Sequence, residues 1–287
     1  MKKFWVVRVS RLLLGAVCLG ALGGCAIVEG VLSGQKPTAR ITGTHFRDLS
    51  LKSVDLVFDV EIGNPYKAAL PLADVDYSLA SGGSRFLSGQ TALEGSIPAQ
   101  GSRTVPLPVK VEFAGLLKVL QTVRPGAVVP YQVEMGLAVD APVIGRTRLP
   151  LRSEGKLPIP TVPKVELTQI RWGKIGLDQI RGTVCLKVTS GCQYAVDLTG
   201  LKASLSLGDV RVADLLTSAP AAMKDANSPA ELEIPISFSP ASAGLGLVRM
   251  ISGSGSGYRL NGGLDVKTPF GPMNMPLNSE GKTTFRK

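Results

Sequence analysis

The 287-residue chain contains one histidine, His45, and only 5% aromatic and 19% charged residues. A single histidine excludes catalytic histidine pairs and metal sites built from several histidines. Neither a Gly-x-Ser-x-Gly nucleophile motif nor a Cys-x-x-Cys pair occurs. The apolar share of 44% is too high for a wholly disordered chain. With 33 glycines and 20 prolines, the composition favours an all-β chain with many turns over a helical one.

The first 25 residues lack acidic side chains and have the parts of a secretory signal. Four positive charges come first, at Lys2, Lys3, Arg8 and Arg11, and an eleven-residue apolar run follows at positions 12–22. This run is shorter than the roughly 20 residues that span a bilayer, so it predicts a signal peptide rather than a membrane helix. A signal anchor is the alternative interpretation.

The signal ends in Leu22-Gly23-Gly24-Cys25, which resembles a bacterial lipobox. The resemblance implies cleavage between Gly24 and Cys25 and lipidation of the Cys25 thiol. Several acyl chains give stable anchoring, because one chain alone binds a membrane only marginally. Ala26 rather than aspartate follows the cysteine, which by the same resemblance implies the outer membrane, with the chain facing the periplasm. An ordinary signal peptide that contains a cysteine is the alternative.

The mature chain has no run of lysine and arginine and no second apolar run of 18 residues. Removal of the four positive charges of the signal lowers the net charge from +10 to +6. Such a mild, dispersed excess is typical of a solvated surface. We therefore expect membrane contact through the acyl anchor, an unidentified protein or lipid partner, and no nucleic acid.

Two cysteines, Cys185 and Cys192, remain after Cys18 leaves with the signal and Cys25 receives lipid. In an oxidising compartment they are candidates for a disulfide. Seven residues of straight strand would separate them by roughly 23 Å, which is beyond disulfide reach. Pairing therefore needs a chain reversal near Ser190-Gly191, and the sequence leaves open whether the bond forms.

An internal repeat predicts the domain organisation. The phrase Pro150–Lys156 (PLRSEGK) returns as Pro276–Lys282 (PLNSEGK), and matches further upstream keep a similar offset. The sequence thus predicts a tandem duplication, with a stiff proline linker between the copies. The expected segments are a signal peptide (1–24), a lipidated tether (25–36), a first domain (37–157), the linker (158–163) and a second domain (164–287).

Strand signals fill each copy. Apolar residues alternate with polar ones along 54–62, and similar alternation recurs to give about seven strands in 37–157. One helix is indicated where Phe113, Leu116, Leu117, Leu120 and Val123 follow helical spacing, with a weaker copy around Leu247, Val248 and Ile251. This pattern predicts an all-β fold of two tandem β-sandwiches of immunoglobulin-like or fibronectin type III-like architecture, each with one short helix.

The run from Val54 to Tyr66, which ends its strand in Asn64-Pro65, resembles the late embryogenesis abundant type 2 domain, also called WHy (water stress and hypersensitive response). The following strand, residues 70–79, fits the same family. The resemblance covers 37–157 well and reaches 164–287 only through the repeat, because Gly191-Cys192-Gln193 replaces Asn-Pro there. It implies a role in desiccation and other stress responses.

The candidate site residues favour structural roles. Asn64-Pro65 is expected to end a strand and start a turn, since asparagine before proline is held extended. Ser153 to Lys156 and Ser279 to Lys282 match Ser-x-x-Lys, but the other motifs of such acyl enzymes are missing. Asp55 and Asp59 are expected on the solvent-exposed face of a strand, where their carboxylates are hydrated and have no catalytic role. No catalytic residue, metal site or cofactor is expected.

We therefore expect a non-enzymatic, membrane-anchored protein that binds a client or partner in desiccation or envelope stress. The alternative is a periplasmic scaffold or lipid-handling adaptor without a protective role. An apolar crevice under the helix would favour lipid, whereas a flat, charged surface would favour a protein partner.

Overall fold

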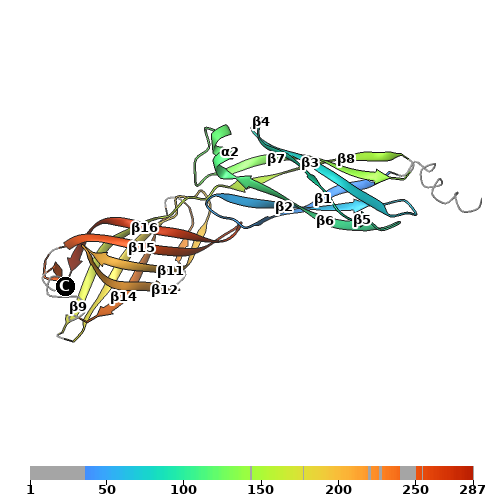
Figure 1. Ribbon diagram of the computed structural model, residues 1–287. Coiled ribbons are helices and arrows are strands. Elements are labelled where there is room, and N and C mark those ends of the chain that lie inside the picture. Colours follow the sequence, from blue (N-terminus) through green and yellow to red (C-terminus); the bar gives the residue numbers. More distant parts are fainter. Residues whose placement is uncertain are drawn as a thin grey trace, which may run out of the picture.

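The computed structural model describes residues 36–142, 144–176, 178–218, 221–225, 228–239, 250–253 and 255–286. It shows two β-sandwich domains arranged end to end (Figure 1). Each domain has its own hydrophobic core, the first between Val54 and Ile159 and the second between Val165 and Leu277. The predicted fold class is confirmed. The expected signal peptide lies outside the described residues, as do Gly24 and Cys25.

Alternating strands build the first domain. The apolar face predicted along 54–62 is buried, with Val54, Phe58 and Ile62 all 0% exposed. A three-stranded sheet has the order β1 (Thr38–Arg47), β2 (Ser53–Gly63), β6 (Ser102–Glu112). A five-stranded sheet has the order β4 (Ser84–Ala92), β3 (Leu70–Ser81), β7 (Val128–Ala141), β8 (Gly145–Pro158), with β5 (Ser96–Ile97) also on β3.

One short helix, α2 (Phe113–Val119), follows β6 in the first domain, as expected. In the second domain, Met250 and Ile251 are helical, while most of the expected counterpart lies outside the described residues. No helix in the part of the chain that the structure describes has the length and apolar character needed to cross a bilayer.

The second domain repeats this topology strand by strand. Its elements are β9 (Lys164–Ile175), β10 (Ile180–Thr189), β11 (Val196–Leu207), β12 (Val210–Thr217), β13 (Ala221–Met223), β14 (Ala230–Phe238), β15 (Gly255–Thr268) and β16 (Gly271–Arg286). The antiparallel pairs β9–β10–β14 and β12–β11–β15–β16 reproduce those of the first domain. In addition, β16 pairs in parallel with β9 at Thr284–Arg286, which joins the two sheets into one of eight strands.

Prolines explain why the first domain keeps two separate sheets. Counted from the repeated phrase, the positions of Thr284–Arg286 correspond to Pro158, Ile159 and Pro160. Proline has no backbone N–H to donate to a neighbouring strand. The N–H of Ile159 is already used, since it donates to the carbonyl oxygen of Ala127 at 2.9 Å. This segment therefore cannot extend the pairing of β8 onto β1.

The glycine of the repeated phrase lies beneath a tyrosine in both domains. Tyr131 covers Gly155, where an added Cβ would come within 2.6 Å of the tyrosine oxygen. Tyr258 covers Gly281 in the same way, at 3.1 Å. Burial raises the pKa of Tyr131, against a smaller lowering by the hydrogen bond with Thr44. The phrase recurs because only glycine leaves room for the ring.

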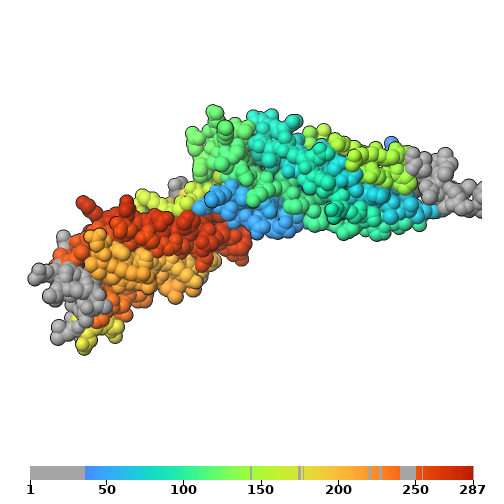
Figure 2. Space-filling model, in the orientation of Figure 1, coloured from blue at the N-terminus to red at the C-terminus, as the bar shows by residue number. Residues whose placement is uncertain are grey.

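The two domains meet in an ordered joint. Phe270, in the β15–β16 turn, packs edge to face against Phe46 of β1 and against Tyr194, with ring centroids 5.4 and 5.2 Å apart. Leu49, in the β1–β2 turn, contacts both cores. In the space-filling view the red strands of the second domain abut the blue strands of the first (Figure 2).

Backbone contacts also connect the two domains at this joint. Gln193 donates its N–H to the carbonyl oxygen of Gly126 at 2.8 Å, and its side-chain oxygen accepts the N–H of Val128 at 3.3 Å. Gly126 has φ +92 and lies so close to the carbonyl oxygen of Gly191 that a side chain would collide with it. The segment Gly191-Cys192-Gln193, which departs from Asn-Pro, therefore contacts the first domain, as Phe270 does.

The expected linker, 158–163, is more closely packed than a free spacer. Pro158 is the last residue of β8, and Ile159 is 1% exposed in the first core. Only Val162 stands out, at 47% exposed. The core of the first domain thus extends at least two residues past the expected boundary at 157.

Gly126→Ala is expected to open the joint, because the new methyl group meets the Gly191 carbonyl. Small-angle X-ray scattering of the variant should show a broader range of distances between the domains. Gly145→Ala is the matched control, since Gly145 has φ +72 but nothing lies within 4 Å of an added Cβ. It should cost about 1 kcal/mol of backbone strain and leave the scattering unchanged. Identical scattering from both variants would contradict the role of this contact.

Candidate binding surface on the first domain

The Asn64 side chain ties together the loops at one end of the first domain. It is 3% exposed, and its Nδ2 donates to the carbonyl oxygens of Ala68 at 2.8 Å, Pro98 at 2.9 Å and Ile97 at 3.2 Å. Its Oδ1 accepts the N–H of Tyr66 at 3.0 Å. The asparagine is thus fully engaged inside the protein, and Pro65 continues the turn that it starts. Its role is structural.

The two remaining cysteines do not form a disulfide in the structure; both are free and buried. Cys185 lies on β10 between two core residues, Val184 and Leu186, so its side chain faces away from the core, where Gln169 Nε2 lies 3.8 Å from its sulfur. Cys192 belongs to the second core. Cys192 thus packs in the second core while Cys185 faces away from it, and the disulfide that the sequence left open is not formed in this conformation.

Cys192 instead neighbours a buried tyrosine at the joint. Burial raises the pKa of Tyr194, and the Cys192 thiol beside it raises that pKa further. The Tyr194 side chain is consequently neutral at physiological pH, as suits a buried hydroxyl group at the joint.

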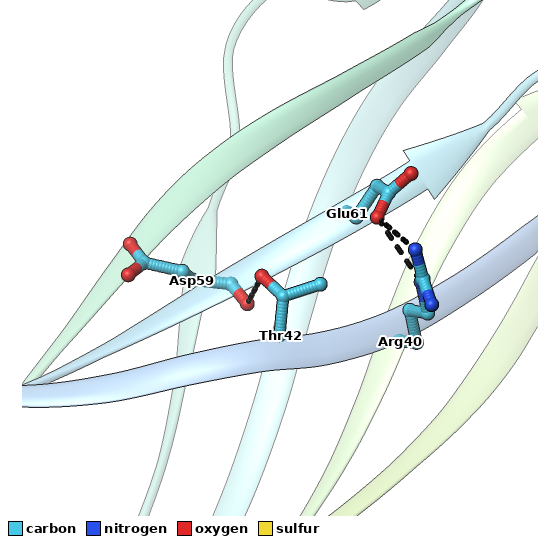
Figure 3. A network of polar contacts seen from close by, with 4 residues as sticks. All are labelled: Arg40, Thr42, Asp59 and Glu61. Atoms are coloured by element: carbon cyan, nitrogen blue, oxygen red, sulfur yellow. Dashed lines mark hydrogen bonds and ion pairs between the residues drawn. The ribbon is translucent and has the colours of Figure 1, made fainter.

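His45, Asp55 and Asp59 lie on the solvated face of the β1–β2 ladder. Arg40 donates to Glu61 Oε2 from Nε at 3.0 Å and from Nη2 at 2.6 Å, and Thr42 Oγ1 donates to the Asp59 carbonyl oxygen at 3.1 Å (Figure 3). His45 Nδ1 lies 3.3 Å from Asp59 Oδ2, with the histidine side chain 52% exposed. Exposed pairs of this kind contribute little energy and show no catalytic arrangement.

The Ser-x-x-Lys phrases do not form a nucleophilic site either. Ser279 Oγ donates to the Val165 carbonyl oxygen at 2.5 Å and lies 3.3 Å from Tyr258 Oη, while Lys282 is exposed. The serine therefore joins β16 to β9. Among the described residues, no three His, Cys, Asp or Glu side chains gather closely enough to hold a metal ion.

The outer face of the β4-β3-β7-β8 sheet carries a charged trough. Three shallow grooves of about 730, 620 and 610 Å³ run across it. The first two share Ser78, Arg85, Glu134 and Arg152, so the grooves are continuous. The third adjoins through Ala80, Gly83, Gln132 and Glu154. We call this continuous surface the charged trough.

An ion pair that crosses a glycine shapes its floor. Asp76 on β3 meets Arg148 on β8, with Oδ1 and Nη1 2.9 Å apart, and the pair spans the intervening strand β7. An added Cβ at Gly136 of β7 would lie 2.5 Å from that Asp76 oxygen and 2.9 Å from the Arg148 Cδ. Glycine is therefore needed at this position for the pair to lie flat across the sheet.

Further ion pairs extend the trough along β8. Arg152 Nη2 lies 3.2 Å from Glu134 Oε1, and Arg146 Nη2 lies 2.8 Å from Asp74 Oδ2. The arginines are largely exposed, at 59% for Arg148 and 81% for Arg152. Exposed pairs are weakly held, so these charges can exchange partners with an incoming protein surface at little cost.

The second domain has no equivalent row of arginines on the described part of β16. Pro272, Asn274, Pro276 and Asn278 occupy the corresponding positions. Sequence reasoning missed the trough, because the residues that form its ion pairs lie up to 72 positions apart. The alternating arginines at 146, 148 and 152 were the available signal.

The space under helix α2 is filled rather than open. Phe113 and Leu116 of the helix are buried in the first core. The helix side chains thus occupy the place where an apolar crevice would favour lipid, whereas the sheet presents a shallow, charged surface.

Comparison with known proteins finds one family in both domains. The profile of the family described as late embryogenesis abundant protein matches residues 59–155 and 193–281. The desiccation protectant protein Lea14 homolog of Glycine max is 33% identical over 136 residues, 47% of this chain and 90% of that protein. Late embryogenesis abundant protein Lea14-A of Gossypium hirsutum is 27% identical over 139 residues, 48% of this chain and 92% of that protein. The solution structure of AT1g01470 from Arabidopsis thaliana has 27% identity and a TM-score of 0.37, covering 44% of this chain and 84% of that one.

Asn64→Asp is expected to destabilise the first domain by about 3 kcal/mol, because a carboxylate would face three carbonyl oxygens and lose their hydrogen bonds. Thermal unfolding followed by circular dichroism measures the change. Asn278→Asp makes the same chemical change at an exposed position and should leave the melting temperature within about 1 °C. A stable Asn64→Asp variant would show that the turn does not depend on this side chain.

Proposed function

The chain belongs to the late embryogenesis abundant protein family, and we propose that it is a non-enzymatic, lipid-anchored member that binds a client or partner protein in the response to desiccation or envelope stress. The family match in both domains and the desiccation-related relatives support a stress-related role. The observation that carries the binding proposal is the charged trough.

The fold favours protection by binding a client over protection by a polar, disordered chain that replaces water around it. Two packed cores leave the backbone in hydrogen-bonded sheets, so this chain cannot coat its surroundings as a hydrated coil does. Protection then has to come from contact between a folded surface and a damaged client. A broad, shallow face with exchangeable charges suits weak and reversible contact with many partners.

The anchor rests on the lipobox-like segment Leu22–Cys25. Acylation at Cys25 would confine the two domains to a membrane surface, and the sorting pattern around Ala26 supports the outer membrane and its periplasmic side. A protectant held there would meet envelope clients rather than cytoplasmic ones.

Cys25→Ser is expected to abolish incorporation of radiolabelled fatty acid and to leave a precursor that retains the signal peptide, because the serine hydroxyl does not replace the thiol as lipid acceptor. Metabolic labelling with immunoprecipitation measures both effects. Cys18→Ser is the matched control and should label normally. Fatty-acid incorporation that persists in Cys25→Ser would refute the lipoprotein assignment.

The two domains, residues 36–287, are expected to preserve the activity of a drying-sensitive enzyme better than an equal mass of albumin. Reversing two trough charges, with Arg148→Glu and Arg152→Glu, should lower that protection by about half or more, because the repelled client would bind more weakly. Residual enzyme activity after drying and rehydration is the measurement. Heat-denatured chain should protect less than folded chain.

The matched control for the trough is Lys202→Glu with Arg259→Glu, which makes the same charge change on the corresponding sheet of the second domain. This control should protect as well as the wild type. Equal losses in both variants would remove the trough from the proposal. Protection no better than albumin would overturn the stress role and leave the scaffold alternative.

A further inference from the structure

One end of the first domain brings together the first described residues and three loops. Thr38 pairs with Gly63, so the chain enters beside the loop that follows β2. Asn64 donates its N–H to Gly101 at 2.8 Å, which brings in the loop before β6. The pairing of Leu72 with Val139 places the β7–β8 turn there as well. We call this the anchor end; it faces away from the second domain (Figure 1).

The anchor end carries apolar side chains at its turn tips. Ile144, in the β7–β8 turn, is 47% exposed, one of four large hydrophobic side chains in the described residues that remain so open. Pro98 and Ala99, at the tip of the neighbouring loop, are exposed too. Turn tips are normally polar, so two apolar tips at the same end of the domain indicate a binding partner.

The repeat shows what this turn does when a partner is present. Ile144 precedes the first residue of β8 as Phe270 precedes the first residue of β16, so the two occupy the same position. Phe270 packs against Phe46 of the preceding domain. Its equivalent, Ile144, is exposed at the end where the chain enters. The position is thus a docking position in the second domain and is exposed in the first.

Cationic side chains lie at the same end of the domain as the exposed turn. Lys36, Lys67 and Arg103 are exposed at this end, and Arg103 donates to the backbone oxygen of Ser96 at 3.4 Å. Arg146 pairs with Asp74 and Asp140. Glu94 and Asp140 are acidic side chains at the same end. An apolar tip flanked by lysine and arginine is the combination that binds the interface of an anionic bilayer.

We propose that the anchor end rests on the surface of an anionic lipid bilayer, with Ile144 inserted among the headgroups and Lys67 and Arg103 facing lipid phosphates. The proposal rests on the lipid anchor of the proposed function. Ten residues separate Cys25 from Lys36, a span of at most about 35 Å, so the acylated chain holds this end next to the membrane. The second domain then points away from the bilayer.

The test uses the acylated full chain in vesicles of phosphatidylethanolamine and phosphatidylglycerol. Ile144→Cys and Val162→Cys each receive an environment-sensitive fluorophore; both positions are 47% exposed, and Val162 lies at the joint. Cys185 and Cys192 are buried, so the unsubstituted chain serves as the labelling blank. Lipids carrying a quencher should quench the probe at 144 about threefold more than the probe at 162. Lys67→Glu with Arg103→Glu should reduce that difference.

The other outcomes overturn the proposal in distinguishable ways. Equal quenching at 144 and 162 in chain that floats with the vesicles would leave the anchor intact and refute the membrane contact. Shielding of the 144 probe from an aqueous quencher, without quenching by lipid, would place a second copy of the chain at this end instead. Chain that does not float at all would refute the anchor and, with it, the contact that depends on it.

Discussion

In each domain a tyrosine lies flat over a cross-strand glycine and reaches with its hydroxyl group to the first strand of the same domain. Tyr131 covers Gly155 and bonds Thr44 of β1, while Tyr258 covers Gly281 and accepts the N–H of Leu167 on β9 at 3.2 Å. A buried phenol needs a partner, and the glycine leaves room for the ring to lie across the neighbouring strand. This single arrangement links the two sheets of a sandwich, fixes the register of the last hairpin and accounts for the most repetitive phrase in the sequence.

Once the two sandwiches exist, their differences decide how the molecule is used. The second domain lacks the Asn-Pro turn, and its Gln193 and Phe270 contact the first domain. The first domain keeps Asn64, which binds its own loops, and carries Ile144 at the position of Phe270. Ion pairs across β7 belong to the first domain as well. The two copies therefore differ in role. The first domain carries the charged trough and the exposed Ile144, and the second domain packs against the first.

The sequence was most informative where side chains report on a local environment. Alternation along 54–62 gave a strand with its buried face, and the offset between the copies gave the paired topology. The charged trough could not be predicted from the sequence, because the contact among Asp76, Gly136 and Arg148 depends on the register of three strands. The orientation of one of the two cysteines could have been predicted. Val184 and Leu186 form the inward face of their strand, so Cys185 between them points outward. The Gly126–Gly191 approach, by contrast, depends on a backbone conformation that no composition reveals.

The prolines at 158 and 160 also determine how the two domains carry mechanical load. Tension applied between the two ends of the described chain enters the second domain through β9 and leaves through β16, and these strands are joined in parallel at Thr284–Arg286. Parallel terminal strands pulled in opposite directions load their hydrogen bonds in shear, so several must break together. In the first domain β1 and β8 are not joined by any such pairing in the described residues. When the chain is pulled from its two ends, we therefore expect the first domain to unfold before the second, which stays folded while the first extends.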